Sequence, residues 1–220
     1  MYLSRRQFIG SGAAAGAVAA FAGSSAIAGT VDRALTPVPS TPARILVDPV
    51  IDPQLLARAR ASFARHRNRL QHVDMVGIAD FSKPSAMPRF YLMDTYTGRV
   101  TSHLVSHGRG SDPDHSGWLQ RFSNSIGSYA SSNGAYVTGD YYQGHYGRSM
   151  RVSGLDHTNS NAQARAIVIH SAWYAEPNQV QQYGRLGRSE GCFAMSYSSL
   201  QETLARLGPG RFLYADKVGA

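Results

Sequence analysis

Cysteine and lysine are the scarcest chemically reactive residues in this chain. Cys192 is the only cysteine in 220 residues, which excludes an internal disulfide framework and any metal site of the Cys-x-x-Cys type. Lysine occurs only as Lys83 and Lys217, so arginine carries most of the formal charge of +8. The arginines are scattered and form no basic run, which argues against a nucleic-acid partner. Arginine forks suit carboxylates and phosphates, so the charge favours an anionic polymer as partner.

A run of large aliphatic residues long enough to span a membrane is also absent. The longest uncharged stretch, near the start, is mostly alanine and glycine. Ser4-Arg5-Arg6-Gln7-Phe8-Ile9 has the pattern of a twin-arginine export signal, and Ala26-Ile27-Ala28 fits a signal cleavage site. We therefore predict a signal peptide over 1–28, an extended linker over 29–50 and one domain over 51–220. The expected location is the periplasm or cell envelope with no stable membrane span after cleavage, and an uncleaved anchor is the alternative.

Hydrophobic patterning predicts a mostly β, α+β domain with a helix near each end. Asp52 and Pro53 have the residue types of a helix cap and a first helical position. Alternating segments around Thr95-Tyr96-Thr97-Gly98 predict a β-hairpin. Ala166-Ile167-Val168-Ile169 is a short apolar run that is typical of a strand buried on both faces, and it ends at His170.

The second helix is expected to follow the only cysteine. Ser198 with Gln201, or Ser199 with Glu202, has the spacing of a capping box. The helix carries three leucines at helical spacing and ends before Gly208 and Pro209, and a final strand follows over 211–214.

The segment RLGRSEGCFAM, residues 185 to 195, holds Cys192 in a polar, glycine-containing loop. A free thiol is mostly protonated at neutral pH, so a nucleophilic cysteine needs a base or a positive neighbour. His170, at the end of a buried strand, is the best candidate for that base. Gly191 lets a substrate approach the backbone, and N–H groups at the expected helix entry are candidates for an oxyanion hole. A buried packing cysteine and a core histidine are the alternative interpretation.

The two segments together resemble a known family. Ile169-His170-Ser171-Ala172 followed by Ser189-Glu190-Gly191-Cys192 is similar to the signature of YkuD-type L,D-transpeptidases. Gly187-Arg188-Ser189-Glu190-Gly191-Cys192-Phe193-Ala194 resembles the Gly-Arg-Ser-x-Gly-Cys-Pro-Ala motif of a divergent branch, with Phe193 in place of proline. The resemblance extends over roughly residues 50 to 216 and implies a β-sandwich or barrel.

The resemblance implies a role for each site residue. Cys192 is the nucleophile, His170 is the base, and the backbone carbonyl of Ser171 fixes the imidazole tautomer. The substrate is a peptidoglycan tetrapeptide stem, which loses D-alanine and is joined to a second stem in a 3–3 cross-link. No metal or cofactor is implied. The expected substrate-binding residues are Arg188, Ser189, Gly191, His107 and Tyr146.

Other interpretations of the same residues stay open. Water as the acceptor gives an L,D-carboxypeptidase, and a cysteine peptidase on the same stems or a non-catalytic wall-binding protein is also compatible. Papain-like enzymes place cysteine before histidine in the chain, whereas here histidine comes first. The spacing of His103, His107 and His115 matches no strong metal-site template. The oligomeric state is not determined by the sequence.

Overall fold

The computed structural model describes residues 51–219. The predicted signal peptide and linker lie outside the described residues. Within these residues no helix is both long enough and apolar enough to cross a membrane. The helices are α1 (Pro53–His66), α2 (Pro177–Tyr183) and α3 (Tyr197–Leu207), with short 3₁₀ turns at Arg67–Arg69, Arg109–Ser111 and Trp173–Ala175. The strands are β1 (Met75–Asp80), β2 (Phe90–Asp94), β3 (Val100–His103), β4 (Gly134–Gly144), β5 (Gly147–Gly154), β6 (Val168–Ser171), β7 (Phe193–Met195) and β8 (Phe212–Asp216).

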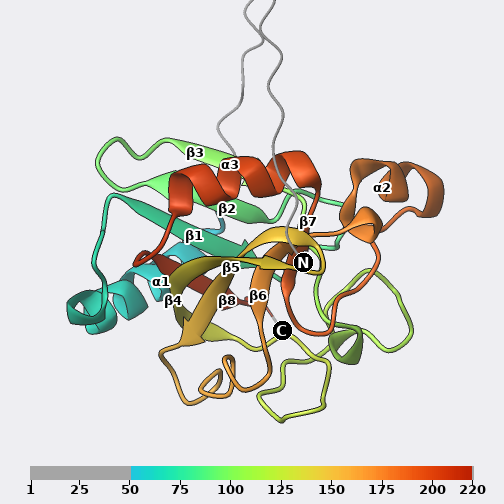
Figure 1. Ribbon diagram of the computed structural model, residues 1–220, viewed down its shortest axis with the longest axis horizontal. Coiled ribbons are helices and arrows are strands. Elements are labelled where there is room, and N and C mark those ends of the chain that lie inside the picture. Colours follow the sequence, from blue (N-terminus) through green and yellow to red (C-terminus); the bar gives the residue numbers. More distant parts are fainter. Residues whose placement is uncertain (1–50, 220) are drawn as a thin grey trace, which may run out of the picture. The chain divides into compact units, whose positions relative to one another are not determined.

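The eight strands form one curved sheet in the order β3-β2-β1-β8-β4-β5-β6-β7 (Figure 1). Most neighbours are antiparallel, but β1 with β8 and β6 with β7 are parallel pairs. The chain beyond β3 links the two edges, because the Ser106 N–H donates to the Ala194 carbonyl of β7 at 2.7 Å. The sheet therefore closes on itself, in agreement with the mostly β sandwich or barrel that we expected.

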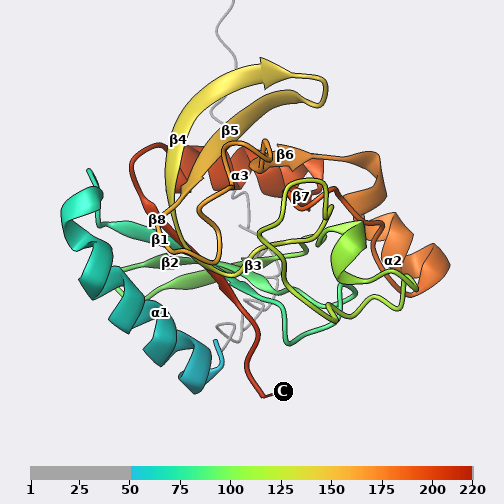
Figure 2. The ribbon, with the colours of Figure 1, turned by 90° about the horizontal axis from the view of Figure 1, so that it is seen from below.

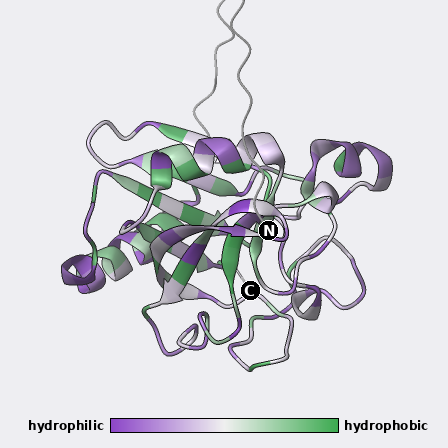
Figure 3. Ribbon diagram, in the orientation of Figure 1, coloured by the Kyte–Doolittle hydropathy of each residue, from purple (hydrophilic) through white to green (hydrophobic). Residues whose placement is uncertain are grey.

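Side chains alternate between two hydrophobic clusters on the two faces of the sheet. Val76 and Ile78 of β1 contribute to the cluster beneath α1, whereas Met75 and Ala79 contribute to the cluster beneath α3. Helix α1 packs against β4 and β8, and α3 packs against β1, β2 and β6 (Figure 2). Figure 3 shows apolar residues concentrated on the central strands, and polar residues on α2, the loops and parts of the β4–β5 hairpin.

The β4–β5 hairpin arches away from the body of the sheet (Figure 2). Its register shifts between Thr138 and Tyr141, where β4 carries one residue more than β5. A bulge of this kind bends and twists a hairpin. The bend brings the hairpin tip, which includes Tyr146, next to the end of β6, where the Ser171 hydroxyl donates to the Tyr146 carbonyl at 3.2 Å.

The helix ends agree with the sequence in one case and differ in the other. The Asp52 carboxylate accepts hydrogen bonds from the Gln54 and Leu55 N–H groups, which confirms the predicted cap of α1. The predicted capping boxes of α3 were wrong. The cap is Ser196, whose hydroxyl accepts from the Ser199 N–H, so the helix begins earlier than expected.

Candidate active site

Cys192 immediately precedes strand β7, and α3 begins five residues later at Tyr197. The expectation that the cysteine stands at a helix entry was therefore wrong. The residue is partly exposed, and its Sγ lies 3.6 Å from the Ala166 carbonyl oxygen. Burial raises the pKa of the Cys192 thiol above its ordinary value of about 9, and the nearby Glu190 carboxylate adds to that shift. The Val168 N–H and the Arg165 guanidinium oppose it, and the net result is a thiol that stays protonated at neutral pH.

His170 lies within β6 and is almost completely buried. Its Nδ1 is 2.8 Å from the Ser171 carbonyl oxygen. A carbonyl oxygen only accepts, so Nδ1 carries the proton and Nε2 has the free lone pair. Burial lowers the pKa of His170 below its ordinary value, although the bond to Ser171 partly opposes the shift. The imidazole is therefore neutral at pH 7 and able to accept a proton through Nε2.

The two residues come from neighbouring segments of the sheet, since His170 lies in β6 and Cys192 directly precedes β7. In the parallel β6–β7 ladder, Ile169 is opposite Phe193 and His170 is opposite Ala194, so Cys192 lies level with Val168. Positions two apart on a strand point to the same face. Ile169 and Phe193 point into the main core, and therefore His170 and Cys192 point to the opposite side. No hydrogen bond joins their side chains among the described residues.

Ser189 and Gly191 shape the turn that leads to the cysteine. The Ser189 hydroxyl, which is buried, donates to the Cys192 carbonyl at 2.7 Å and accepts from the Gly191 N–H at 3.1 Å. Gly191 has φ +114°, a conformation open mainly to glycine, and a Cβ at this position would lie 2.6 Å from the Ala130 carbonyl oxygen. These contacts favour a structural role for both residues over the substrate contact expected from the sequence.

The same bonds restrict the oxyanion hole. The Gly191 N–H is engaged with the Ser189 hydroxyl. The Cys192 N–H has no hydrogen-bond acceptor among the described residues. Of the two backbone donors considered, the Cys192 N–H is thus the one left free to bind an oxyanion.

Tyr146 covers His170 from the β4–β5 hairpin. The two rings are stacked, with centroids 4.5 Å apart and an angle of 25° between the ring planes. The tyrosine itself is exposed on its other side. The structure therefore brings Tyr146 against His170, where its ring shields the imidazole from water, and its role in binding substrate stays a prediction.

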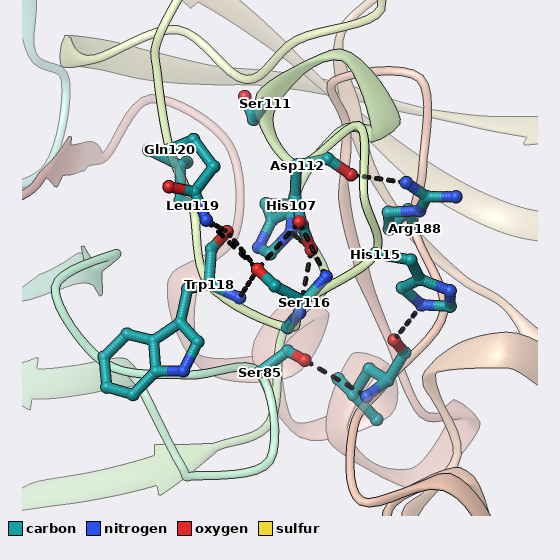
Figure 4. Close-up of polar contacts among 12 residues, drawn as sticks. Ser85, His107, Ser111, Asp112, His115, Ser116, Trp118, Leu119, Gln120 and Arg188 are labelled. Atoms are coloured by element: carbon teal, nitrogen blue, oxygen red, sulfur yellow. Dashed lines mark hydrogen bonds and ion pairs between the residues drawn. The ribbon is translucent and has the colours of Figure 1, made fainter.

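His107 lies in a buried hydrogen-bond network with Arg89 and Asp112, and Figure 4 shows the Asp112 side of it. Its Nδ1 is 2.8 Å from Arg89 Nη2, and its Nε2 is 3.2 Å from the Asp112 carboxylate. Since arginine only donates, Nδ1 accepts and Nε2–H donates to Asp112. Burial and the Arg89 charge lower the pKa of His107 to about 3, so the ring is neutral.

The network fixes the backbone beside the catalytic loop. Asp112 also accepts from the N–H groups of Ser116 and Gly117, and although burial alone would raise its pKa, these bonds lower it. The His107 carbonyl accepts from the Ser189 N–H at 2.9 Å. With a side chain only 1% exposed, His107 is placed to position the loop, and its burial does not favour the substrate contact that we expected.

Arg188 is also tied to this region (Figure 4). Its Nη1 donates to the backbone carbonyls of Asp112 and Pro113. Its Nε and Nη2 have no hydrogen-bond partner among the described residues. Arg188 thus holds the neighbouring loop with one nitrogen and keeps other donors for a ligand.

Two residues near the thiol were not singled out from the sequence. Arg165 donates to the Ser123 carbonyl and the Ser132 hydroxyl at 2.7 and 2.6 Å, and its charge lowers the pKa of Cys192. Tyr174 packs against the loop that leads to Cys192, because its carbonyl accepts from the Gly187 N–H at 2.7 Å, and burial raises the pKa of its phenol. In the sequence, only the closeness of Arg165 and Tyr174 to His170 pointed to a place near the site.

The remaining histidines considered for a metal site each have another contact. His115 Nε2 is 2.9 Å from the Leu186 carbonyl, and His103 Nε2 is 3.7 Å from the Glu202 carboxylate. Over residues 51–219, no group of three or more histidine, cysteine or acidic side chains is arranged to hold a metal ion.

Solved structures with similar folds include several named L,D-transpeptidases. One from Mycobacterium smegmatis is 14% identical over 65% of this chain and 58% of its own, with a TM-score of 0.39. One from Stackebrandtia nassauensis is 12% identical over 76% of this chain and 69% of its own, with a TM-score of 0.40. The helical cell shape determining protein Pgp2 of Campylobacter jejuni is 14% identical over 66% of this chain and 48% of its own, with a TM-score of 0.41.

This chain spans less than two thirds of the length of the Mycobacterium smegmatis protein, and these identities and TM-scores are low. No curated protein matches the chain. The family model described as the L,D-transpeptidase catalytic domain matches residues 48–215, which include every residue of the site. By this match, the chain belongs to the L,D-transpeptidase catalytic domain family.

Proposed function

We propose that this protein is a cysteine-dependent acyltransferase that acts as an L,D-transpeptidase on peptidoglycan stem peptides. The observation that carries the proposal is the pairing of β6 with β7, which aligns His170 and Cys192 on one face in a member of this family. Cys192 is partly exposed as a residue, although burial raises the pKa of its thiol, and we propose that substrate reaches Sγ from this exposed side.

In the first proposed step, Cys192 Sγ attacks the carbonyl carbon of the third residue of a tetrapeptide stem. His170 Nε2 takes the thiol proton as the carbon–sulfur bond forms. The Cys192 N–H holds the negative oxygen of the tetrahedral intermediate. The amide bond then breaks and His170 returns the proton to the leaving nitrogen. D-alanine departs, and the rest of the stem stays bound to Cys192 Sγ as a thioester.

In the second step, the side-chain amine of another stem attacks the thioester. His170 removes a proton from that amine and returns one to the sulfur, which restores the thiol and leaves a 3–3 cross-link. The raised pKa of Cys192 and the lowered pKa of His170 support proton transfer during attack, and they do not support a resting thiolate–imidazolium pair. Because Sγ contacts the Ala166 carbonyl in this structure, the proposed proton transfer requires the thiol to rotate toward His170.

Incubation of the purified protein with disaccharide-tetrapeptides, followed by mass spectrometry, tests the proposal. Loss of D-alanine together with dimer formation is the expected result. Loss of D-alanine without dimers indicates that water is the acceptor and the protein is a carboxypeptidase. Unchanged peptides count against an enzyme. The Cys192→Ala variant is the control and is expected to show neither product, and a carbapenem is expected to add covalently only to the protein that keeps Cys192.

We also propose export to the cell envelope, on the twin-arginine pattern of residues 4–9. Residues 1–50 fused to a reporter protein are expected to direct it out of the cytoplasm. Replacing Arg5 and Arg6 by lysine, which keeps the charge, is expected to retain the reporter inside the cell.

A further inference from the structure

An exposed ion pair lies beside the catalytic loop and takes no part in the proposed chemistry. Arg109 Nη2 is 3.1 Å from the Glu190 carboxylate. The two side chains are 49% and 65% exposed, so water competes for both groups. An exposed pair of this kind contributes little net free energy, and another carboxylate can therefore replace Glu190 at small cost.

The Arg109 side chain is held in place by more than Glu190. Its guanidinium lies over the Tyr129 ring, 3.8 Å from the centroid. Arg109, Tyr129 and Arg188 line an open cavity of about 300 Å³. Among the described contacts, only one nitrogen of the Arg109 guanidinium is hydrogen-bonded, and the Arg188 guanidinium also keeps free donors. The cavity therefore presents two arginine forks, which suit a planar carboxylate, and the Tyr129 ring supports one of them.

The backbone places this cavity close to the nucleophile. The Arg109 N–H donates to the Ser189 carbonyl at 2.7 Å. Gly108 packs so tightly on Gly191 that a Cβ at Gly108 would lie 2.8 Å from the Gly191 Cα. Gly108 and Arg109 therefore both contact the turn that precedes Cys192. We infer that a short peptide bound at the thiol reaches Arg109.

We propose that Arg109, with Tyr129 and Arg188, forms a subsite for a carboxylate of the stem peptide, and that Glu190 occupies this subsite until substrate binds. The identity of the ligand rests on the proposed function. Glu190 belongs to the catalytic loop, so its release on substrate binding frees a side chain two residues before the nucleophile. The carboxylate is either the C-terminal one of the tetrapeptide or one inside the stem.

Binding measurements in a Cys192→Ala background test the subsite without turnover. The probes are a tetrapeptide stem with free carboxylates, the same peptide amidated at its C-terminus, and a form amidated only at internal carboxylates. Isothermal titration calorimetry gives Kd for each. Arg109→Gln is expected to raise the Kd of the free peptide about tenfold. With the parent protein, one of the two amidated peptides is expected to show a Kd raised by the same factor. That peptide identifies which carboxylate is bound.

Two further variants separate the subsite from general charge effects. Glu190→Gln is expected to tighten binding of the free peptide by about two- to fivefold, because the internal competitor is gone. Arg99→Gln removes an exposed arginine in the β2–β3 turn and is expected to leave Kd unchanged. Thermal unfolding of each variant shows whether it is folded.

The proposal is overturned if Arg109→Gln binds the free peptide as tightly as the parent, if it weakens both amidated peptides by the same factor as the free one, or if no peptide binds the parent. Failure of the proposed function has a different signature. If the native protein releases no D-alanine while binding still depends on Arg109 and a free carboxylate, the subsite stands and the enzyme assignment falls.

Discussion

The Nδ1 atom of His170 lies 2.8 Å from the carbonyl oxygen of Ser171, the next residue in the chain. The contact fixes the imidazole as the Nε2 base without a negative charge beside it. A carboxylate in this position would stabilise the protonated ring, whereas a carbonyl does so only weakly. His170 therefore combines a fixed tautomer with a lowered pKa.

As the pH is lowered, activity is expected to fall, along the acid limb of its pH profile, only at pH values below the ordinary pKa of histidine, about 6.5. Because burial lowers the pKa of His170, the base stays neutral as the pH falls through 6.5 and is protonated only below it. The pH dependence of kcat/KM for D-alanine release measures this limb in the free enzyme. His170→Gln is expected to lower kcat by about 10²- to 10⁴-fold. An acid limb above pH 7 would contradict the assignment.

The Tyr146 ring is expected to contribute to the lowered pKa of His170. Replacing it by alanine opens His170 to water, which reduces the desolvation that lowers its pKa. The acid limb of kcat/KM should therefore move to higher pH. Tyr183→Ala, at an exposed tyrosine in α2, is the matched control and should leave the limb in place. An unchanged limb in Tyr146→Ala means that the stacked ring does not shield the base.

The Cys192 thiol is expected to react as a neutral thiol when no substrate is present. Because its pKa is raised above about 9, the rate of alkylation by iodoacetamide should climb only in strongly alkaline buffer. Mass spectrometry of the only cysteine follows the reaction. Rapid alkylation at pH 6 would show a resting thiolate paired with His170. Arg165→Gln should raise the pKa further, since it removes the nearby positive charge.

Gly191→Ala is expected to destabilise the protein by about 2–4 kcal/mol. The substitution places a Cβ 2.6 Å from the Ala130 carbonyl and forces alanine to φ +114°. Gly127→Ala is a matched control, because Gly127 has φ +77° but no atom within 4 Å of its Cβ position. It should cost only about 1 kcal/mol. Chemical denaturation compares the two, and equal losses would remove the steric argument.

His107 is expected to make stability fall with acid. Its pKa is lowered to about 3 by burial in the folded state, whereas the unfolded side chain takes up a proton near pH 6.5. The unfolded state therefore binds more protons between these values, and stability is lost as the pH falls from 6.5 toward 3. At pH 5 the loss from this residue is about 2 kcal/mol.

His107→Gln provides the test, because glutamine retains a donor for Asp112 but does not titrate. Its free energy of unfolding should be lower at pH 7 and should change less between pH 7 and pH 5. His145→Gln, at an exposed histidine, should keep the slope of the native protein. The same slope in all three proteins would place the titrating group elsewhere.

Elements with strong local signals were predictable from the sequence. The α1 cap at Asp52 and the hairpin between β2 and β3 depend on contacts between near neighbours in the chain, and the apolar run that leads into β6 is a local pattern. Strand β7 was missed because it has only three residues and lies between a loop and a helix. Its pairing with β6 is a contact between distant segments, which local periodicity does not reveal.

The candidate site divides in the same way. Cys192 and His170 are recognisable as candidates from residue type and motif, because the proposed reaction requires a thiol and a base. The roles of Ser189 and His107 were less accessible, since polar side chains serve equally well for substrate contact or for buried hydrogen bonds. Burial decides between these uses, and burial is a property of the packed chain.

The sequence by itself determined the family, the mostly β character and the candidates for the reactive groups. Only the tertiary structure decided that His170 and Cys192 share a face, that Tyr146 covers the imidazole and that Glu190 pairs with Arg109. The physical reason is that the chemistry of a residue and its local pattern are present in the sequence itself. The distance between two side chains depends instead on how separate strands and loops pack together.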